Sequence, residues 1–399
     1  MATYRLGEHV FADDHPDFQL TAARAHRQHL RPLCLCREDG LEMYVARIRD
    51  KYILKRMPET GSQHALTCAS YEPPAVLSGL GEVIGSAIQS NHEDGTTTLR
   101  FDFSMTRKKP VTAAGGTAGE CASSQVRSDG SRLSLRGVLH YLWSEAGLHR
   151  WVPAMVGKRT WSVIHKYLLR AACDKVVRGQ ALDGLLYVPE PFVLAEKDAI
   201  LARRMAMFEH ARQYGASARS LMLLVGEIKE IKDARYGKKI IIRHLPDCPF
   251  LLRSDIGEGL SRRFKNELEL WSAFDDVRLM VCGTFGVTIS GVPMIEELTL
   301  MLVNAQWLPF ENCYEKTLLD RLVEERRRFE KCLRYNLAAD KPLAAAVLSD
   351  TKEAVALYLV PPGSTLNVDE AIAQMREHCS FAAWVWDCSE SALPALPSI

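Results

Sequence analysis

The 399-residue sequence contains no uninterrupted apolar run of about 18 residues, the length that a membrane-spanning helix needs. Its longest apolar runs, such as Leu221–Val225, have the length of a strand. The N-terminus carries neither the basic segment nor the apolar segment of a signal peptide, so we expect a cytoplasmic protein without a membrane partner. The net charge is only +1, so any argument for a nucleic-acid partner has to be local.

Several catalytic signatures are also missing. The sequence has no phosphate-binding glycine loop ending in GK[ST], and no convincing Ser/His/Asp or Cys/His grouping. What is present is an ordinary globular composition, 47% hydrophobic and 25% charged, in a chain long enough for two or three domains. Eleven cysteines without an export signal indicate reduced thiols, and a clustered set of Cys and His then indicates a metal site or a reactive group.

The order of strand-like, helix-like and small polar segments along the chain predicts a multidomain protein of the α+β or α/β class. We expect a β-rich zinc-binding module over 1–109, with a hairpin formed by Met43–Ile48 and Lys51–Lys55. Residues 110–131 are small and polar, which predicts a linker or mobile loop. A helical basic region over 132–215 and a mixed α/β domain over 216–399 follow, the latter including a helix over Tyr314–Tyr335.

Four residues near the N-terminus have the spacing of metal ligands: Cys34, Cys36, His64 and Cys68. Two cysteines one residue apart at a strand end can direct both thiolates toward one ion, and a His and a Cys four residues apart share one face of a helix. Zinc prefers four nitrogen or sulfur ligands in a tetrahedron. A set closed by protein ligands leaves no position for a substrate, so the sequence predicts a structural zinc. The alternative is three buried thiols and an incidental histidine.

The window Gly130–Gln180 is strongly basic, with nine Lys and Arg residues against two acids. Tyrosines and tryptophans are interleaved with these charges, and aromatic faces can stack on bases while Lys and Arg contact phosphates. A helix, the segment WVPAMVGKRTW and a second helix are compatible with a helix-turn-helix variant. The alternative is that the tryptophans form a core and the charges a solvated surface. The candidates for nucleic-acid binding are Arg150, Lys158, Arg159, Lys166 and Arg170.

A weaker pattern suggests metal-dependent hydrolysis. Glu227 and Lys229 follow an apolar strand, as in half of the motif of restriction-endonuclease-like nucleases, where the carboxylate binds Mg²⁺ and the lysine positions water. Glu315 at a helix start and Asp350 at a strand end could add ligands, but the next strand, Ala354–Val360, lacks the expected acid and lysine. The sequence therefore predicts a nuclease-like core with degraded chemistry or an unrelated α/β core.

Several segments together resemble one bacterial family, domain of unknown function 1173, which is typical of integrative conjugative elements. They are CLC and GSQHALTC, then LRGVLHYLWSEAGLHRW and GKRTW, then GEIKEI and HLPDCP, and finally WLPFENCYE, RRRFEKCLRYNL and VLSDT. The resemblance covers residues 5–390. It implies a neighbourhood of DNA mobility and no particular reaction.

These observations favour a zinc-containing accessory protein of a conjugative or mobile element that binds nucleic acid, with DNA as the expected type and other element proteins as further partners. The first alternative is a Mg²⁺-dependent nuclease that uses Glu227 and Lys229, or Glu315 and Asp350. The second is a scaffold that docks protein partners through the zinc module.

Overall fold

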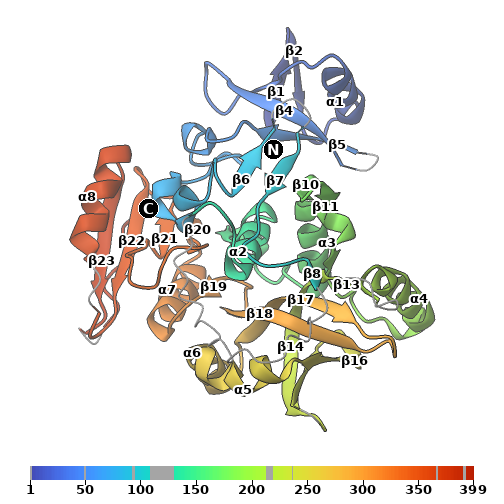
Figure 1. Ribbon diagram of the computed structural model, residues 1–399. Coiled ribbons are helices and arrows are strands. Elements are labelled where there is room, and N and C mark those ends of the chain that lie inside the picture. The colour runs from blue at the N-terminus through green and yellow to red at the C-terminus, as the bar shows by residue number, and fades with distance from the viewer. Residues whose placement is uncertain are drawn as a thin grey trace.

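The computed structural model describes residues 2–48, 51–91, 95–107, 130–212, 219–235, 237–364, 367–389 and 392–399. These residues form a mixed α/β protein with several sheets, as the sequence predicts at that level (Figure 1). Most of the predicted linker 110–131 lies outside the described residues. Within the described ranges, every helix is too short or too polar to cross a membrane.

An antiparallel sheet of five strands forms the N-terminal module (blue in Figure 1). Its order is β2-β1-β3-β4-β5, and the strands are β1 (Thr3–Leu6), β2 (His9–Ala12), β3 (Leu33–Cys34), β4 (Leu41–Ile48) and β5 (Lys51–Arg56). Helix α1 (Phe18–Arg27) covers β4 and β5 through Ala22 and Ala25, and the predicted hairpin of β4 and β5 is confirmed. The apolar core of this sheet is small, because its largest cluster has only four fully buried side chains.

The next strands join another part of the molecule. A four-stranded sheet has the order β11-β10-β7-β6, formed by β6 (Ile88–Ser90), β7 (Thr97–Leu99), β10 (Lys175–Val177) and β11 (Gln180–Ala181). The parallel pair of β7 and β10 joins its two halves. β8 (Thr106–Arg107) pairs with β13 (Arg219–Ser220). The N-terminal sheet therefore ends at Arg56, and the strands after it belong to the body of the protein.

Helices α2 (Leu135–Glu145) and α3 (Trp161–Ala172) lie at the centre of that body (Figure 1). Eight of the eleven residues of α2 are buried, and they pack in one core with α3 and three strands of the barrel described next. Residues 146–160 separate the two helices and contain strand β9 (Arg150–Trp151) and a 3-10 turn. A helix-turn-helix joins its helices by three or four residues, so this interpretation of the segment is wrong.

Five strands close into a barrel in the second half of the chain: β14 (Met222–Asp233), β15 (Lys238–Ile242), β16 (Leu245–Leu252), β17 (Arg278–Val287) and β18 (Pro293–Val303). The long strand β14 pairs with β15 at one end and with β17 at the other, which closes the ring β14-β15-β16-β18-β17. The β16–β18 pair is parallel and the others are antiparallel. This strand order is that of an OB-fold barrel.

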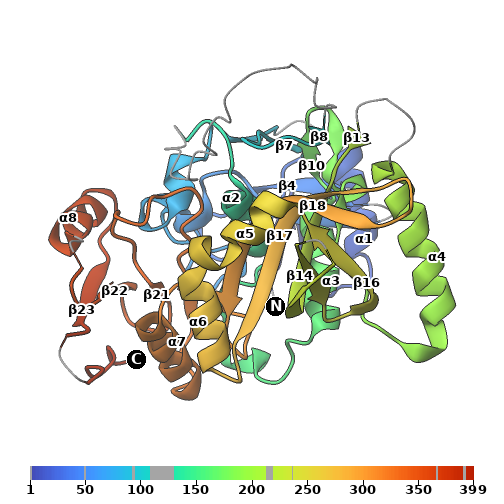
Figure 2. The same cartoon turned by 60° about the horizontal axis from the view of Figure 1, so that its bottom comes forward.

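Helices and short strands complete the barrel. α5 (Ser254–Arg263) and α6 (Lys265–Ala273) connect β16 to β17, and β12 (Leu186–Tyr187) and β19 (Pro309–Phe310) extend its sheet. Helix α4 (Lys197–Phe208) lies beside the barrel (Figure 2), where Phe208 packs edge-on against Phe250 and Phe285. The mixed α/β composition expected for this part of the chain is present, and apolar side chains of the barrel pack in one cluster with α7 and with strands of the C-terminal sheet.

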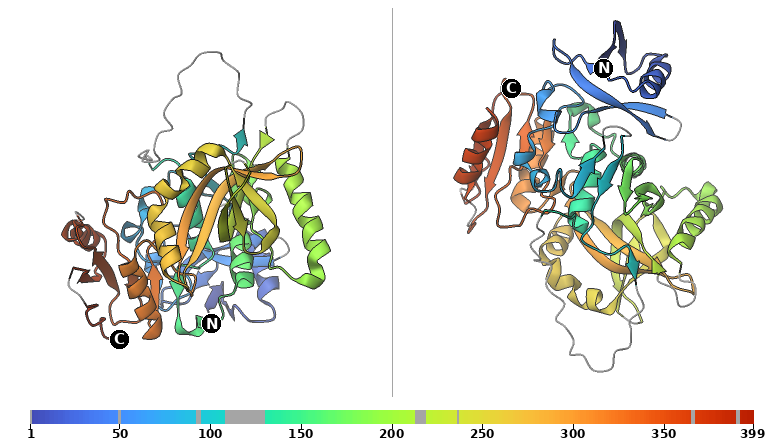
Figure 3. Two further views of the ribbon diagram at one scale, coloured as in Figure 1. Left: turned by 90° about the horizontal axis from the view of Figure 1, so that it is seen from below. Right: turned by 45° about the horizontal axis from the view of Figure 1, so that its top comes forward.

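The last sheet has the order β23-β22-β21-β20-β9 and lies beside the barrel (red and orange in Figure 3). It contains β20 (Phe329–Lys331), β21 (Ala346–Leu348), β22 (Val355–Val360) and β23 (Ala382–Asp387), with α8 (Val368–His378) between the last two. Helix α7 (Cys313–Glu324) precedes it and ends eleven residues before the predicted end at Tyr335. The helix ends in a left-handed cap at Arg326, which has a φ of 58°. The N–H groups of Arg326 and Arg327 donate to the carbonyls of Val323 and Leu322, respectively, and so satisfy two carbonyls of the last turn.

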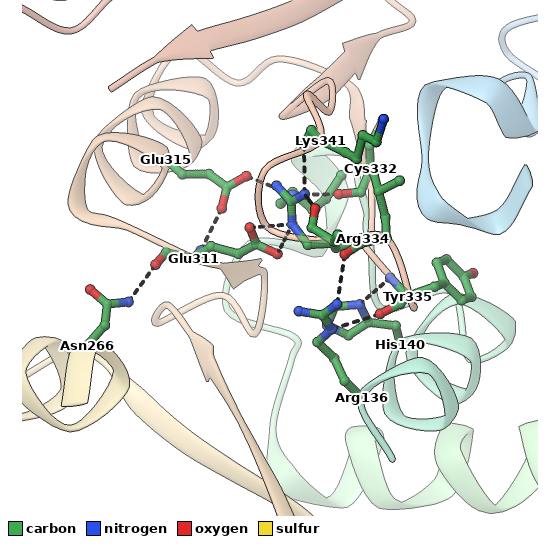
Figure 4. Close-up of polar contacts among 12 residues, drawn as sticks. Arg136, His140, Asn266, Glu311, Glu315, Cys332, Arg334, Tyr335 and Lys341 are labelled. Carbon is green, nitrogen blue, oxygen red and sulfur yellow. Dashed lines mark hydrogen bonds and ion pairs between the residues drawn. The ribbon is translucent and has the colours of Figure 1, made fainter. Parts of the chain in front are cut away.

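A buried polar cluster joins α2 to the loop that follows β20 (Figure 4). Arg334 donates to both carboxylate oxygens of Glu311, and Arg136 donates to the carbonyl of Tyr335. His140 Nδ1 accepts a hydrogen bond of 2.9 Å from the backbone N–H of Tyr335. Burial lowers the pKa of His140 to about 3, so the ring is neutral at neutral pH.

This burial predicts a pH dependence of stability. Because the pKa of His140 is lower in the folded state, the unfolded state takes up the proton first as the pH falls. The contribution of His140 should be complete above about pH 6.5 and decrease below it, by about 1.4 kcal/mol per pH unit. Urea unfolding at pH 7 and at pH 4.5 measures how much unfolding free energy each protein loses between the two pH values. His140→Asn, whose amide oxygen can still accept a hydrogen bond from the N–H of Tyr335, should lose about 2 kcal/mol less than the wild type. Equal losses in both proteins would contradict the assignment.

Candidate metal centre and basic cleft

The first pair of ligands comes from the middle of the N-terminal sheet. Cys34 is the last residue of β3, between β1 and β4, where it pairs with Tyr4 and Leu41. Its thiol is buried, and Cys36 follows in the turn after the strand. The predicted placement of this pair at a strand end is confirmed.

The second pair comes from a turn and not from the expected helix. His64 follows a 3-10 turn, Gly61–Gln63, and has an extended backbone with φ −67° and ψ 157°. A turn then follows, in which the N–H of Cys68 donates to the carbonyl of Ala65. The N–H of Ser70 donates to Cys68 Sγ at 3.4 Å, which holds this sulfur in place.

The four side chains meet at one point. Cys34 Sγ lies 3.7 Å from Cys68 Sγ, and His64 Nδ1 lies 3.3 Å from Cys36 Sγ and 3.7 Å from Cys68 Sγ. All four ligand atoms lie within 4.8 Å of one another. In a tetrahedron with Zn–S bonds of about 2.3 Å and Zn–N bonds of about 2.0 Å, ligand atoms are separated by roughly 3.5–3.8 Å. The donor set and its spacing therefore fit a zinc ion.

The electrostatics of the site reflect the close approach of its thiols. The shared hydrogen bond raises the pKa of Cys34 and lowers the pKa of Cys68, as expected when one thiol donates to a neighbouring thiolate. His64 is 1% exposed, and its Nε2 has no hydrogen-bond partner among the described residues. Cys34, Cys36 and Cys68 would bind the ion as thiolates and His64 through Nδ1, which leaves no position for a substrate.

A cleft of about 890 Å³ separates this centre from the body of the protein. One wall contains Cys36 and Cys68 with their neighbours, and the other contains residues between α2 and α3, the exposed face of α3 and part of the C-terminal sheet. Four of the five candidates for nucleic-acid binding line it: Arg150, Lys158, Arg159 and Lys166. The fifth, Arg170, lines a neighbouring cavity.

Two of these four cations have structural contacts. Arg159 donates to the carbonyls of Leu148 and Gln306 at 2.9 and 3.1 Å, and burial lowers its pKa to about 10. Arg150 donates to the carbonyls of Ala69 and Tyr71, which connects the turn after Cys68 to the body. Lys158 and Lys166 are exposed, and neither side chain makes a hydrogen bond or an ion pair with the described residues.

The nuclease candidates are not brought together. Glu227 is buried and paired with Arg243 and Arg278 at 2.6 and 3.1 Å, while Lys229 is exposed. Glu315 pairs with Lys331, and Asp350 with Arg327. Within the described residues, Cys34, Cys36, His64 and Cys68 form the one group of three or more Cys, His, Asp or Glu side chains close enough to share an ion.

The sequence did not single out some residues that line the cleft. Arg328 contributes a further cation, and Ser349 lies beside it. They flank strands of the C-terminal sheet, Arg328 before β20 and Ser349 after β21, more than 170 residues after Arg150, so no local spacing could indicate them. The pairing of β20 with β9 brings them to this place.

The fold and the site define a class: a small module with a Cys/His cluster that could hold a metal ion, attached to an α/β body that contains a closed barrel. The chain belongs to the family described as a protein of unknown function, DUF1173, whose model matches residues 4–389. This confirms the family resemblance over nearly the whole chain. Neither the curated proteins nor the solved structures contain a match to this chain.

Proposed function

We propose that this protein binds a single strand of nucleic acid in the cleft beside the metal centre, and that a structural zinc ion holds one wall of that cleft in shape. The observation that supports the proposal is the placement of Lys158 and Lys166. Both ammonium groups are exposed at the cleft without an anionic partner among the described residues, and the exposed ring of Tyr167 lies next to Lys166 in the chain.

The charge of the cleft favours a polyanion. Its lining contains five cations, Arg150, Lys158, Arg159, Lys166 and Arg328, against the two acids Asp13 and Glu330. A zinc ion with three thiolates would add one negative charge, which leaves a positive excess. The whole chain has a net charge of only +1, so this excess is local. A localised patch predicts modest affinity that depends strongly on salt concentration.

The size of the cleft favours a single strand over a duplex. About 890 Å³ is within the range of sites that enclose a ligand of a few ring systems. Single strands are usually held by a positive groove that follows the phosphates, together with aromatic side chains on which bases stack. The strand order of the barrel also occurs in proteins that bind oligonucleotides, but that likeness concerns the fold alone.

Charge reversal at the two unpaired lysines tests the proposal. The double variant Lys158→Glu/Lys166→Glu should bind a fluorescein-labelled single-stranded oligonucleotide at least about tenfold more weakly than the wild type. The slope of its log affinity against log salt concentration should be shallower, by the equivalent of about one to two phosphate contacts. Fluorescence anisotropy between 50 and 200 mM salt measures both quantities. DNA and RNA strands of the same sequence, and the DNA duplex, should be compared.

The matched control reverses two exposed lysines outside the cleft, as Lys51→Glu/Lys352→Glu, and changes the net charge equally. This control should retain most of the affinity. If the wild type does not bind any of the three nucleic acids at 50 mM salt, or if both double variants weaken binding equally, the cleft is not the binding site.

The two alternatives have less support. A Mg²⁺-dependent nuclease would need carboxylates close together, whereas Glu227, Glu315 and Asp350 each pair with a different cation. A protein-docking scaffold gains some support from exposed apolar side chains in α4 and just before it, including Met205 and Leu194. A role in conjugation or in a mobile element rests on the family resemblance and remains a proposal.

A further inference from the structure

A second cavity of about 500 Å³ lies next to the basic cleft. The two share five lining residues: Ala69, Ala146, Gly147, Arg150 and Tyr167. The cleft and the cavity are therefore neighbouring compartments that meet at the guanidinium of Arg150 and the ring of Tyr167. The second compartment is bounded by β5 of the N-terminal module on one side and by α2 and α3 on the other.

Three charged residues of the lining, Lys55, Glu145 and Lys175, are linked directly or through Asp174, which is not itself part of the lining. Lys175 Nζ lies 2.7 Å from Glu145 and 3.0 Å from Asp174, and it is located over the ring of Tyr141. Lys55 pairs with the other carboxylate oxygen of Asp174. Lys175 is only 1% exposed, so it serves mainly to hold the two acids in place. Lys55 remains partly exposed toward the cavity, with its charge fixed in position by Asp174.

The remaining groups favour an anion with a ring. Arg170 is exposed at the cavity, and its side chain makes no hydrogen bond or ion pair with the described residues. The cavity is lined by five cations and three acids, and Asp174 pairs with two of these cations from outside the lining, so one positive charge remains in excess. Tyr44 and Tyr141 add aromatic surface, and burial raises the pKa of both, so their hydroxyls stay protonated and can donate hydrogen bonds.

We propose that this second cavity binds one nucleoside monophosphate unit, with the phosphate at Arg170 and Lys55 and the base against the tyrosines. Its volume is within the range of small-ligand sites, and its lining combines apolar surface with a few fixed charges, as such sites do. The unit could be a free nucleotide or the phosphorylated end of a strand that lies in the basic cleft. The second source depends on the function proposed above, and the first does not.

Titration calorimetry with nucleoside 5′-monophosphates and with inorganic phosphate tests the cavity directly. The wild type should bind at least one nucleotide, and Arg170→Glu should weaken that binding about tenfold to a hundredfold, because a hydrogen bond between charged groups is lost and a repulsive charge is gained. Arg170→Lys should recover part of the affinity. Lys51→Glu, on β5 but outside the cavity, is the matched control and should bind like the wild type.

Oligonucleotides with and without a terminal phosphate distinguish the two sources. If a terminal phosphate strengthens binding and Arg170→Glu removes this preference, the cavity receives the end of a strand. If nucleotides bind and oligonucleotides do not, the cavity is a nucleotide site and the proposed strand-binding function fails. If oligonucleotides bind without regard to the terminal phosphate and no nucleotide binds at millimolar concentration, the proposal for this cavity is wrong while the cleft stands. Equal nucleotide binding by wild type and Arg170→Glu also overturns it.

Discussion

Cys68→Ala should abolish stoichiometric zinc binding and unfold the N-terminal sheet. Zinc binding contributes about 10–16 kcal/mol to the folding of small zinc modules, far more than most single side chains. The apolar core around Tyr4, Phe11 and Met43 is too small to replace it. Metal analysis of the purified protein should give about one zinc per chain for the wild type and far less for the variant. Hydrogen exchange should show loss of protection in β1–β5 and little change in the barrel.

Cys379→Ser provides the control, because Cys379 is partly buried far along the chain and its hydrogen bond to the carbonyl of Met375 can be kept by serine. This variant should retain both the zinc ion and the protection of β1–β5 against hydrogen exchange. Removal of the metal with a chelator should reproduce the effect of Cys68→Ala in the wild type. A metal-free wild-type protein with full protection in the N-terminal sheet would show that the four ligands are not a structural zinc site.

Lys331→Met should lower the free energy of unfolding by about 3–5 kcal/mol, because it leaves the Glu315 carboxylate buried without its cation. Lys331 and Glu315 lie 2.8 Å apart and are 3% and 6% exposed, respectively. Glu315 also accepts from the backbone N–H of Glu311, within the polar cluster that joins α7 to the loop after β20 (Figure 4). Urea unfolding at pH 7 measures the loss.

A double-mutant cycle with Glu315→Gln assigns this loss to the pair. The double variant Lys331→Met/Glu315→Gln should recover a large part of the stability, since the uncompensated charge is gone. The same variants address the nuclease alternative, in which Glu315 would bind Mg²⁺ and not Lys331. Additive losses in the cycle, together with stabilisation of the wild type by Mg²⁺, would favour a metal-binding role for Glu315.

The clustering of the four Cys and His side chains was the part of the site that the sequence predicted best. Soft ligands in two close pairs are typical of zinc sites, so Cys34, Cys36, His64 and Cys68 could be grouped without knowledge of the fold. The prediction of a helix for the second pair was wrong, because the spacing of His64 and Cys68 suits a tight turn as well as a helix. Spacing predicts which residues meet and not which turn brings them together.

The predicted helix over Tyr314–Tyr335 shows a different limit. Phe329 and Leu333 continue the apolar spacing of Leu318 and Leu322, so the helical pattern extends beyond the helix itself. The helix ends at an arginine in the left-handed region, where glycine is the usual signal. The pairing of Phe329 with Leu348 and Trp151 then makes it part of a strand. These tertiary contacts outweigh the local pattern.

Charge patterns predicted the region of the basic cleft but not the role of each residue. Lys158 and Arg159 are neighbours with the same charge, yet the lysine is exposed and the arginine is partly buried among carbonyls. The closed barrel was missed for a related reason. The barrel closes because β14 pairs with β15 and also with β17. Pairing with a strand as distant in the sequence as β17 leaves no local signal in the residues of β14.

The strand β9 has a consequence for how the chain folds during synthesis. Arg150 and Trp151 pair with Glu330 and Phe329, so this short strand has to wait for a partner that is made much later. At about 5–20 residues per second, a ribosome needs on the order of ten to forty seconds to reach that partner. The indole of Trp151, fully buried in the finished protein, would be accessible throughout this interval. The nascent chain should therefore be a client of chaperones until its last third has emerged.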